Sequence, residues 1–330
     1  MKRYLFITVV TVSSILTFSF SNNDQTPDRK ESRDKHLKIC VISDLNSSYG
    51  SVLYSEDVSA VVKHLSIIKP DIVVCGGDMV AGQKASLTEQ NIAAMWQSFN
   101  ETILKPVSKL NIPFGFTVGN HDASPSYDTD RMLAAEFWKQ NRALTRLNFV
   151  DSTHFPFYFS YIENNVFFIS WDAAGSKIKP EVFEWIRRQL NGKIAKRARL
   201  RILLGHLPLF PVVESKNKPG EVISNADSTL TLLKENGVDL YISGHQHAFF
   251  PGQKKGVRLL NAGAIGDGPR KIMGHPEAAR KAYTIIEVPV KATKKFKYQT
   301  FVPGSNDFID IELLPDSVVG FNGTLKKEPE

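Results

Sequence analysis

The sequence predicts an α/β fold, in which short buried strands alternate with amphipathic helices. Strands buried on both faces read as unbroken apolar runs, and open α/β sheets gather their ligands at the carboxyl ends of the strands. Five such runs are each followed within a few residues by a side chain that can hold a metal: Ile39–Ile42 with Asp44, Ile72–Val74 with Asp78, Phe114–Val118 with Asn120, His121 and Asp122, Ile202–Leu204 with His206, and Leu240–Ile242 with His245 and His247. We expect these distant residues to meet at one edge of the fold.

The N-terminus predicts a signal peptide over residues 1–21. Lys2 and Arg3 precede an apolar stretch from Leu5 to Phe20, and small residues follow at the end of that stretch. An uncleaved anchor is the alternative interpretation, and no other segment is long and apolar enough to cross a bilayer. We therefore expect a protein exported to the periplasm or the medium, with no stable membrane span after cleavage.

The full sequence has 330 residues, of which 42% are hydrophobic. The part that follows the signal peptide is long enough for one large domain. We expect a disordered spacer over residues 22–36, the domain over residues 37–316, and a loose C-terminal tail over residues 317–330. Cleavage removes two basic residues and no acids, so the formal charge falls from +7 to +5. The basic clusters at 193–201 and 294–297 are typical of a solvated surface, and we do not expect nucleic acid as a partner.

Helical patterns fill the gaps between the apolar runs. The apolar spacing from Glu56 to Lys69 predicts a helix that Pro70 ends, and this helix completes a βαβ unit with the first two strands. A second helix is expected to start at Ser86, whose spacing to Glu89 is that of a capping box. Two more helices are expected over Pro180–Asn191 and Asp227–Asn236, each followed by a glycine.

After His247 the composition shifts toward strands. The expected strands are Val257–Leu260, Tyr283–Val288, Phe296–Phe301 and Phe308–Leu314, and we expect them to complete a second sheet packed against the first. The only two cysteines, Cys40 and Cys75, lie within apolar runs. They are expected to be buried thiols, with a disulfide as the alternative. Any metal must then be held by His, Asp and Asn side chains.

Each candidate ligand is by itself weak evidence of a metal site. Asp44 or Asp78 could be an ordinary turn residue, and His206 could be an interior histidine whose hydrogen bonds are satisfied. The segment from Gly119 to Asp122 packs an amide, an imidazole and a carboxylate into one turn. His245 and His247 can face the same side of an extended segment. Four of the eight histidines thus follow a strand and a glycine, and this conjunction favours a metal site.

These residues resemble the ordered motifs of the calcineurin-like metallophosphoesterases. The matching blocks are Asp44-Leu45-Asn46, Gly77-Asp78, Gly119-Asn120-His121-Asp122, the lone His206, and Gly244-His245-Gln246-His247. Asn261-Ala262-Gly263 and Gly268-Pro269-Arg270 resemble the closing loop of the family. The resemblance covers the chain from Leu37 to about Leu313 and implies a two-sheet α/β/β/α sandwich of the metallophosphoesterase type.

The resemblance implies two divalent metal ions, of Mn, Fe or Zn. One ion would be held by Asp44, Asp78 and His247, with Asn46 as the candidate fourth ligand, and the other by Asp78, Asn120, His206 and His245. Asn46 departs from the family, which usually has histidine at this position. An amide oxygen is harder and less basic than an imidazole nitrogen, so this position should bind more weakly or favour Mn²⁺ or Fe²⁺. Tyr49 is an alternative, phenolate ligand.

The implied activity is hydrolysis of small phosphate esters by a hydroxide held between two metals. His121 would neutralise the phosphoryl oxygens or protonate the leaving group, Asp122 would orient its ring, and Arg270 is a candidate clamp for phosphate. Two alternatives are a metal-binding homologue with little or no activity and an exported nuclease, whose activity would depend strongly on salt. The motifs specify neither the alcohol that is released nor the oligomeric state.

Overall fold

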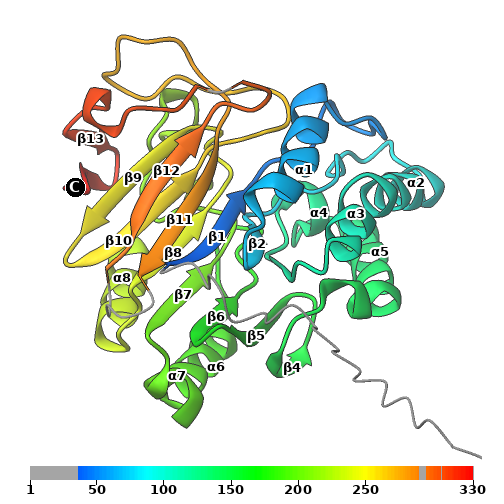
Figure 1. The fold of residues 1–330 in the computed structure, drawn as a ribbon, viewed down its shortest axis with the longest axis horizontal. Coiled ribbons are helices and arrows are strands. Elements are labelled where there is room, and N and C mark those ends of the chain that lie inside the picture. The colour runs from blue at the N-terminus through cyan, green and yellow to red at the C-terminus, as the bar shows by residue number, and fades with distance from the viewer. Residues whose placement is uncertain (1–35, 290–294, 306, 330) are drawn as a thin grey trace, which may run out of the picture. The chain divides into compact units, whose positions relative to one another are not determined.

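Two β-sheets lie between two groups of helices (Figure 1). The computed structural model describes residues 36–289, 295–305 and 307–329. The expected signal peptide, residues 1–21, and residues 22–35 of the expected spacer lie outside the described residues. Within the described part, no helix has the length and apolar character needed to cross a membrane.

The first sheet has five strands in the order β12-β11-β1-β2-β3. Its strands are β1 (His36–Ile42), β2 (Ile72–Cys75), β3 (Phe114–Phe116), β11 (Tyr283–Pro289) and β12 (Lys297–Phe301). β1, β2 and β3 are parallel neighbours, as expected for a sheet with crossover helices. All residues of β2 and β3 are buried, which explains why their sequences are unbroken apolar runs.

The second sheet has nine strands in the order β13-β14-β9-β10-β8-β7-β6-β5-β4. These strands are β4 (Phe149–His154), β5 (Tyr158–Glu163), β6 (Val166–Ser170), β7 (Leu200–Leu204), β8 (Leu240–Ser243), β9 (Phe249–Lys254), β10 (Val257–Ala262), β13 (Ser317–Gly320) and β14 (Gly323–Lys327). The sheets pack face to face, and the rings of Phe116 on β3 and Phe159 on β5 lie 5.2 Å apart. The expected two-sheet sandwich is confirmed.

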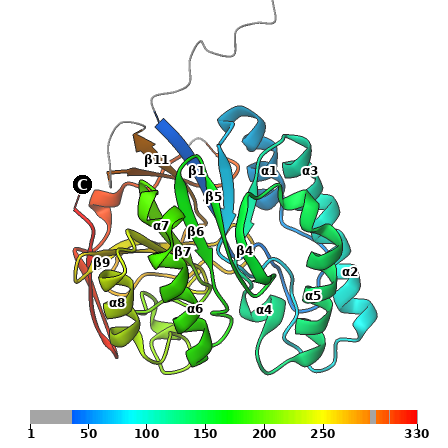
Figure 2. The ribbon, with the colours of Figure 1, turned by 90° about the horizontal axis from the view of Figure 1, so that it is seen from below.

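Helices cover both outer faces of this sandwich. They are α1 (Glu56–Ile68), α2 (Glu89–Phe99), α3 (Lys105–Lys109), α4 (Asn120–Ala123), α5 (Asp128–Asn141), α6 (Pro180–Asn191), α7 (Lys193–Arg197) and α8 (Ala226–Glu235). Short π or 3₁₀ turns are η1 (Asn100–Leu104), η2 (Arg142–Thr145), η3 (Glu214–Lys216) and η4 (Ile311–Leu313). Figure 2 shows α1, α2, α3 and α5 on one side of the strands and α6, α7 and α8 on the other.

Several local predictions need correction. Helix α2 begins at Glu89 rather than at Ser86, because Thr88 and Asn91 form the reciprocal capping bonds. The segment Phe308–Leu314 is not a strand: Phe308 makes one isolated bridge to Phe301, and η4 follows it. Helix α5 and strands β4 to β6 have no counterpart among the predicted elements.

The strands that follow His247 do not build a second sheet by themselves. β11 pairs antiparallel with β1 and extends the first sheet, whereas β10 pairs parallel with β8 in the second sheet. Composition identifies a strand but not the neighbour with which it pairs, because pairing is decided by long-range contacts. Cys40 and Cys75 are both free and buried, as expected.

The C-terminal segment is not the expected loose tail. β13 and β14 form an antiparallel hairpin, and β14 pairs with β9 at the edge of the second sheet. Val318 and Leu325 are each 1% exposed, so two apolar residues within a polar sequence anchor this hairpin. This C-terminal hairpin, Ser317–Lys327, also covers an edge of the sheet that would otherwise be open.

Candidate metal centre

The expected ligands follow the carboxyl ends of strands from both sheets. Asp44 and Asp78 follow β1 and β2, and His206 and His245 follow β7 and β8. Asp44, Asp78, His245 and His247 all have positive φ angles, between 51° and 67°. A non-glycine residue in this region costs on the order of 1–3 kcal/mol, and such strain clusters at functional sites.

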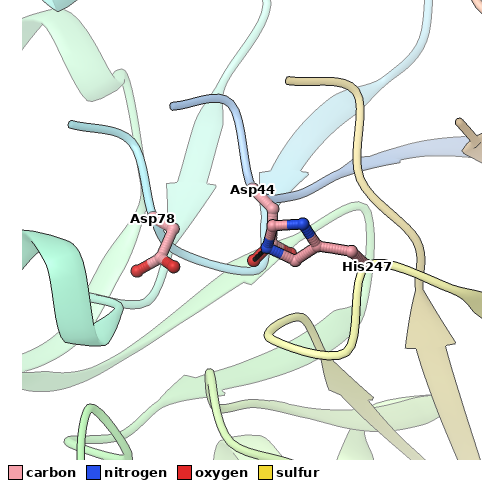
Figure 3. A group of neighbouring side chains, drawn as sticks. All are labelled: Asp44, Asp78 and His247. Atoms are coloured by element: carbon pink, nitrogen blue, oxygen red, sulfur yellow. Dashed lines mark ion pairs between the residues drawn. The ribbon is translucent and has the colours of Figure 1, made fainter. Parts of the chain in front are cut away.

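Asp44, Asp78 and His247 form the first donor group, drawn in Figure 3. One possible ligand atom from each of the three side chains lies within 4.8 Å of the others. His247 Nε2 is 3.1 Å from Asp44 Oδ1, and His247 Nδ1 is 2.8 Å from the carbonyl oxygen of Gly268. The Gly268 carbonyl accepts the proton on Nδ1, so the lone pair of Nε2 points toward the Asp44 carboxylate.

Asp78, Asn120, His206 and His245 form the second donor group. His206 Nε2 lies 3.2 Å from Asp78 Oδ2 and 2.9 Å from Asn120 Oδ1. The same amide oxygen is 2.9 Å from His245 Nδ1. Asp78 is thus shared between the two donor groups, as the resemblance implies. A Cβ at Gly119 would collide with the Asp78 carboxylate, which explains the glycine before Asn120.

The chemistry of these donors fits divalent metal ions. His206 Nδ1 is 2.8 Å from the carbonyl oxygen of Gly76, so Nε2 of the neutral ring carries a lone pair that faces two oxygen acceptors. Burial alone would lower the pKa of His206, but the carboxylates of Asp78 and Asp44 raise it to about 9. A proton on Nε2 therefore offsets the negative charge that faces this nitrogen, and a metal cation can take the place of the proton.

His121 lies beside the second donor group and borders the cavity described below. Its Nε2 atom is 3.9 Å from Asp78 Oδ2, and its Nδ1 atom is 3.1 Å from the carbonyl oxygen of Gly82. Asp122 does not contact this ring, contrary to expectation. It is fully buried and accepts hydrogen bonds from the backbone N–H groups of Met79, Val80 and Gly119. Asp122 therefore fixes the backbone of two ligand-bearing loops, and Gly82 faces the His121 ring in its place.

Asp122→Ala is expected to lower the free energy of unfolding by several kcal/mol. The substitution leaves three backbone donors without their acceptor, and each buried donor left unsatisfied costs about 1–3 kcal/mol. Urea denaturation measures the change. Asp227→Ala, at an exposed aspartate of α8, is the control and should stay close to the wild type. If the Asp122→Ala protein is as stable as the wild type and has lost only its activity, the role expected from the sequence, orienting the His121 ring, would be supported instead.

A polar cavity of about 470 Å³ opens over the second donor group. Asn120, His121 and His245 line it, together with Arg270, whose guanidinium is 3.4 Å from the carbonyl oxygen of His245. Gln83, Lys216 and Glu221 also line the cavity, and no motif in the sequence singled out these three residues. Gln83 accepts a hydrogen bond of 2.6 Å from the Asn120 amide. The hydrogen bond from His245 and the nearby Lys216 lower the pKa of Glu221 to about 2.

Comparison with known proteins agrees with this arrangement. The family model described as calcineurin-like phosphoesterase matches residues 37–249, more than half of the chain. The chain belongs to this family. Five of its motif blocks lie within the matched residues and supply both donor groups. Divalent metals are the cofactors that the family uses, and phosphate esters are its substrate class.

Individual relatives are distant. The chain is 26% identical over 181 residues to purple acid phosphatase 17 of Arabidopsis thaliana, and the match covers 51% of each protein, so the chain spans about half the length of this curated relative. Two solved structures share the fold at 13% identity: purple acid phosphatase PPD1 from yellow lupin (Lupinus luteus) seeds, with a TM-score of 0.61 over 83% of this chain and 53% of that one, and GAP50 of Plasmodium, with a TM-score of 0.52 over 89% of each chain.

Asn46 is where this member of the family departs from the usual motif. It is 7% exposed, and its backbone N–H donates to the carbonyl oxygen of Asp78 at 3.2 Å. Its own carbonyl oxygen accepts a hydrogen bond of 3.1 Å from the Asp267 N–H. The loop that contains Asn46 is therefore hydrogen-bonded to the loop that contains Asp78. A role for the Asn46 side chain as a ligand stays a prediction.

Asn46→His is expected to raise the affinity of the first donor group for Zn²⁺. The substitution replaces a weakly basic amide oxygen with an imidazole nitrogen, which Zn²⁺ prefers. Competition with a chromophoric chelator measures the dissociation constants of the wild type and the variant. Asn165→His, at a turn between β5 and β6, is the control for a histidine added elsewhere. Equal affinity in all three proteins would contradict the interpretation of Asn46 as an impaired ligand.

Proposed function

We propose that this protein is an exported, metal-dependent phosphoesterase that hydrolyses small phosphate esters with two divalent metal ions. One observation carries the proposal: the buried Asp78 carboxylate is shared by the two donor groups, beneath a polar cavity. Export rests on the pattern of residues 1–21, and N-terminal sequencing of the recovered protein checks it, since the mature chain should start near Asn22.

The side chains in and around the cavity would have different roles in hydrolysis. Two bound divalent cations would supply the charge that activates water and stabilises phosphoryl oxygens. Asp78 would hold both positions together, and His121 borders the space where a phosphate ester would sit. From there it can donate a proton to the departing oxygen or a hydrogen bond to the phosphoryl group. Arg270, half-buried in the same wall, matches phosphate geometry with paired N–H donors.

A phosphate-release screen tests this proposal. The protein would be stripped of metal, reloaded with Mn²⁺, Fe²⁺ or Zn²⁺, and assayed on aryl phosphate monoesters, aryl diesters and nucleotides. We expect metal-dependent hydrolysis that a chelator abolishes, together with two bound ions by elemental analysis. Activity unaffected by metal removal would contradict the proposal. Activity confined to DNA or RNA, with a steep dependence on salt, would favour the nuclease.

One observation favours a second candidate, a metal-binding homologue with little or no activity. The chain has Asn46 where the family usually has a histidine, a change that would weaken the donor set of the first position. A fold of this kind does not by itself imply catalysis. GAP50, which shares the fold, is described as the anchor in the inner membrane complex of Plasmodium. Metal bound without hydrolysis of any monoester or diester would support this candidate.

A further inference from the structure

Glu221 contacts a metal-donor histidine but has no part in the mechanism above. Its Oε2 atom is 2.7 Å from His245 Nε2. The His245 side chain is 6% exposed and that of Glu221 is 28% exposed, so the contact lies at the border between the protein interior and the cavity. Since one partner is an ionised carboxylate, this is a short, charge-assisted hydrogen bond.

This contact determines which nitrogen of His245 is free to bind a metal. An ionised carboxylate accepts hydrogen bonds and cannot donate them, so a neutral His245 ring that keeps this hydrogen bond carries its proton on Nε2 and its lone pair on Nδ1. Nδ1 is the atom that lies 2.9 Å from Asn120 Oδ1, inside the second donor group. Without Glu221, the described contacts give His245 no acceptor on Nε2, and the other tautomer becomes accessible.

The segment that carries Glu221, residues 209–224, is held in place from several sides. Gln246, between the two motif histidines, accepts hydrogen bonds from the N–H groups of Val212 and Val213 at 3.0 and 3.2 Å. The Ser224 N–H donates to the carbonyl oxygen of Ser176 at 2.9 Å. The carboxylate of Glu221 is therefore presented to His245 by an anchored loop.

The C-terminal hairpin braces the same segment. The backbone N–H of Phe321 donates to Asn217 Oδ1 at 2.7 Å, and the Asn322 amide donates to the carbonyl oxygen of Leu209 at 2.9 Å. A Cβ at Gly320 would collide with the ring of Pro211. Residues near the end of the chain thus hold the loop that faces the donor group.

Lys216 also contacts His245, but it does not select the ring nitrogen that carries the proton, as Glu221 does. Its ammonium is 3.5 Å from Glu221 Oε2 and lies 3.1 and 3.2 Å from the two ring nitrogens of His245. A group almost equally distant from both nitrogens cannot lie on the axis of either lone pair. Lys216 therefore offsets the charge of Glu221 and leaves the Nδ1 lone pair of His245 available.

We propose that Glu221 is a positioning residue that fixes the tautomer and orientation of His245, so that Nδ1 faces the second metal. The proposal rests on the proposed function insofar as the second donor group holds a metal. Carboxylates that accept the other ring N–H of a metal-bound histidine typically strengthen metal binding about 10–100-fold.

Two variants and a control test this role in the full chain. Glu221→Ala removes the acceptor, and Glu221→Gln keeps a carbonyl oxygen of the same reach. Glu214→Gln removes one negative charge from the same segment, at an exposed residue outside the cavity lining. Zn²⁺ affinity is measured by competition with a chelator. We expect Glu221→Ala to lower the affinity for one of the two Zn²⁺ ions about 10–100-fold. Glu221→Gln should recover part of this lost affinity, and Glu214→Gln should bind Zn²⁺ as the wild type does.

A second readout needs neither metal nor turnover. Imidazole ¹⁵N spectra of the metal-free protein, assigned with a His245→Gln variant, report which ring nitrogen carries the proton. We expect the Nε2–H form in the wild type and a mixture of tautomers in Glu221→Ala. Unchanged tautomer and unchanged Zn²⁺ affinity in Glu221→Ala would overturn the proposal. If the wild type binds no metal at all, the proposed function fails, while the ¹⁵N spectra still decide the role of Glu221.

Discussion

Asp78→Asn is expected to release metal from both positions and to lower turnover by on the order of 10³-fold or more. Metal ions contribute several kcal/mol to stabilising charge in such transition states, and 1.36 kcal/mol corresponds to a factor of ten in rate. Asp78 is the one carboxylate shared by the two donor groups. Asparagine tolerates the positive φ of this position, so the loop should persist while the negative charge is lost.

Metal content by elemental analysis and phosphate release from an aryl monoester measure the two parts of this prediction. Asp151→Asn is a suitable control, because Asp151 accepts side-chain hydrogen bonds from Trp185 and Gln189 rather than lying in either donor group. The control should keep both ions. Two tightly bound ions in Asp78→Asn would show that Asp78 does not bridge the positions.

His121→Ala is expected to lower turnover by about 10²–10⁴-fold, the range typical of general acid–base residues, without loss of metal. His121 lines the cavity with its side chain 20% exposed, and its Nε2 atom is 3.9 Å from the shared carboxylate. It contacts Asp78 through its backbone N–H as well, at 2.9 Å, and alanine keeps that bond. The metal positions should therefore survive the substitution.

Steady-state kinetics and elemental analysis on the same preparations separate chemistry from binding. His154→Ala, at an exposed histidine of β4, serves as the matched control and should keep wild-type turnover. Unchanged turnover in His121→Ala would remove His121 from the mechanism. Loss of metal together with activity would make His121 a support of the ligands instead of a participant in catalysis.

The strand-end residues could be predicted because their signals are local. A fully buried strand such as β2 must be apolar throughout, and a polar residue shortly after its end marks the edge of the sheet. The recurrence of this pattern in Asp44, Asp78, Asn120, His206, His245 and His247 predicted the convergence that the structure confirms.

Other features depended on neighbours that no local pattern specifies. Asp122 was expected beside the His121 ring because the family resemblance implied it, yet its carboxylate turns toward the backbone of Met79 and Val80, more than 40 residues away. Polarity predicted a loose end for the chain, whereas the structure has a hairpin there that pairs with β9 and buries Val318 and Leu325.

The amino-acid sequence alone determined the kind of fold, the order of the ligand blocks and the chemistry of their donors, because apolar periodicity and strand-end residues are properties of short segments. Tertiary structure alone decided which sheet each late strand joins, what fixes the ligand loops, and that Glu221 lies against His245. Those outcomes depend on which surfaces meet after the chain has folded. Glu221 and His245 are separated in the sequence by α8 and β8, so no local pattern predicts their contact.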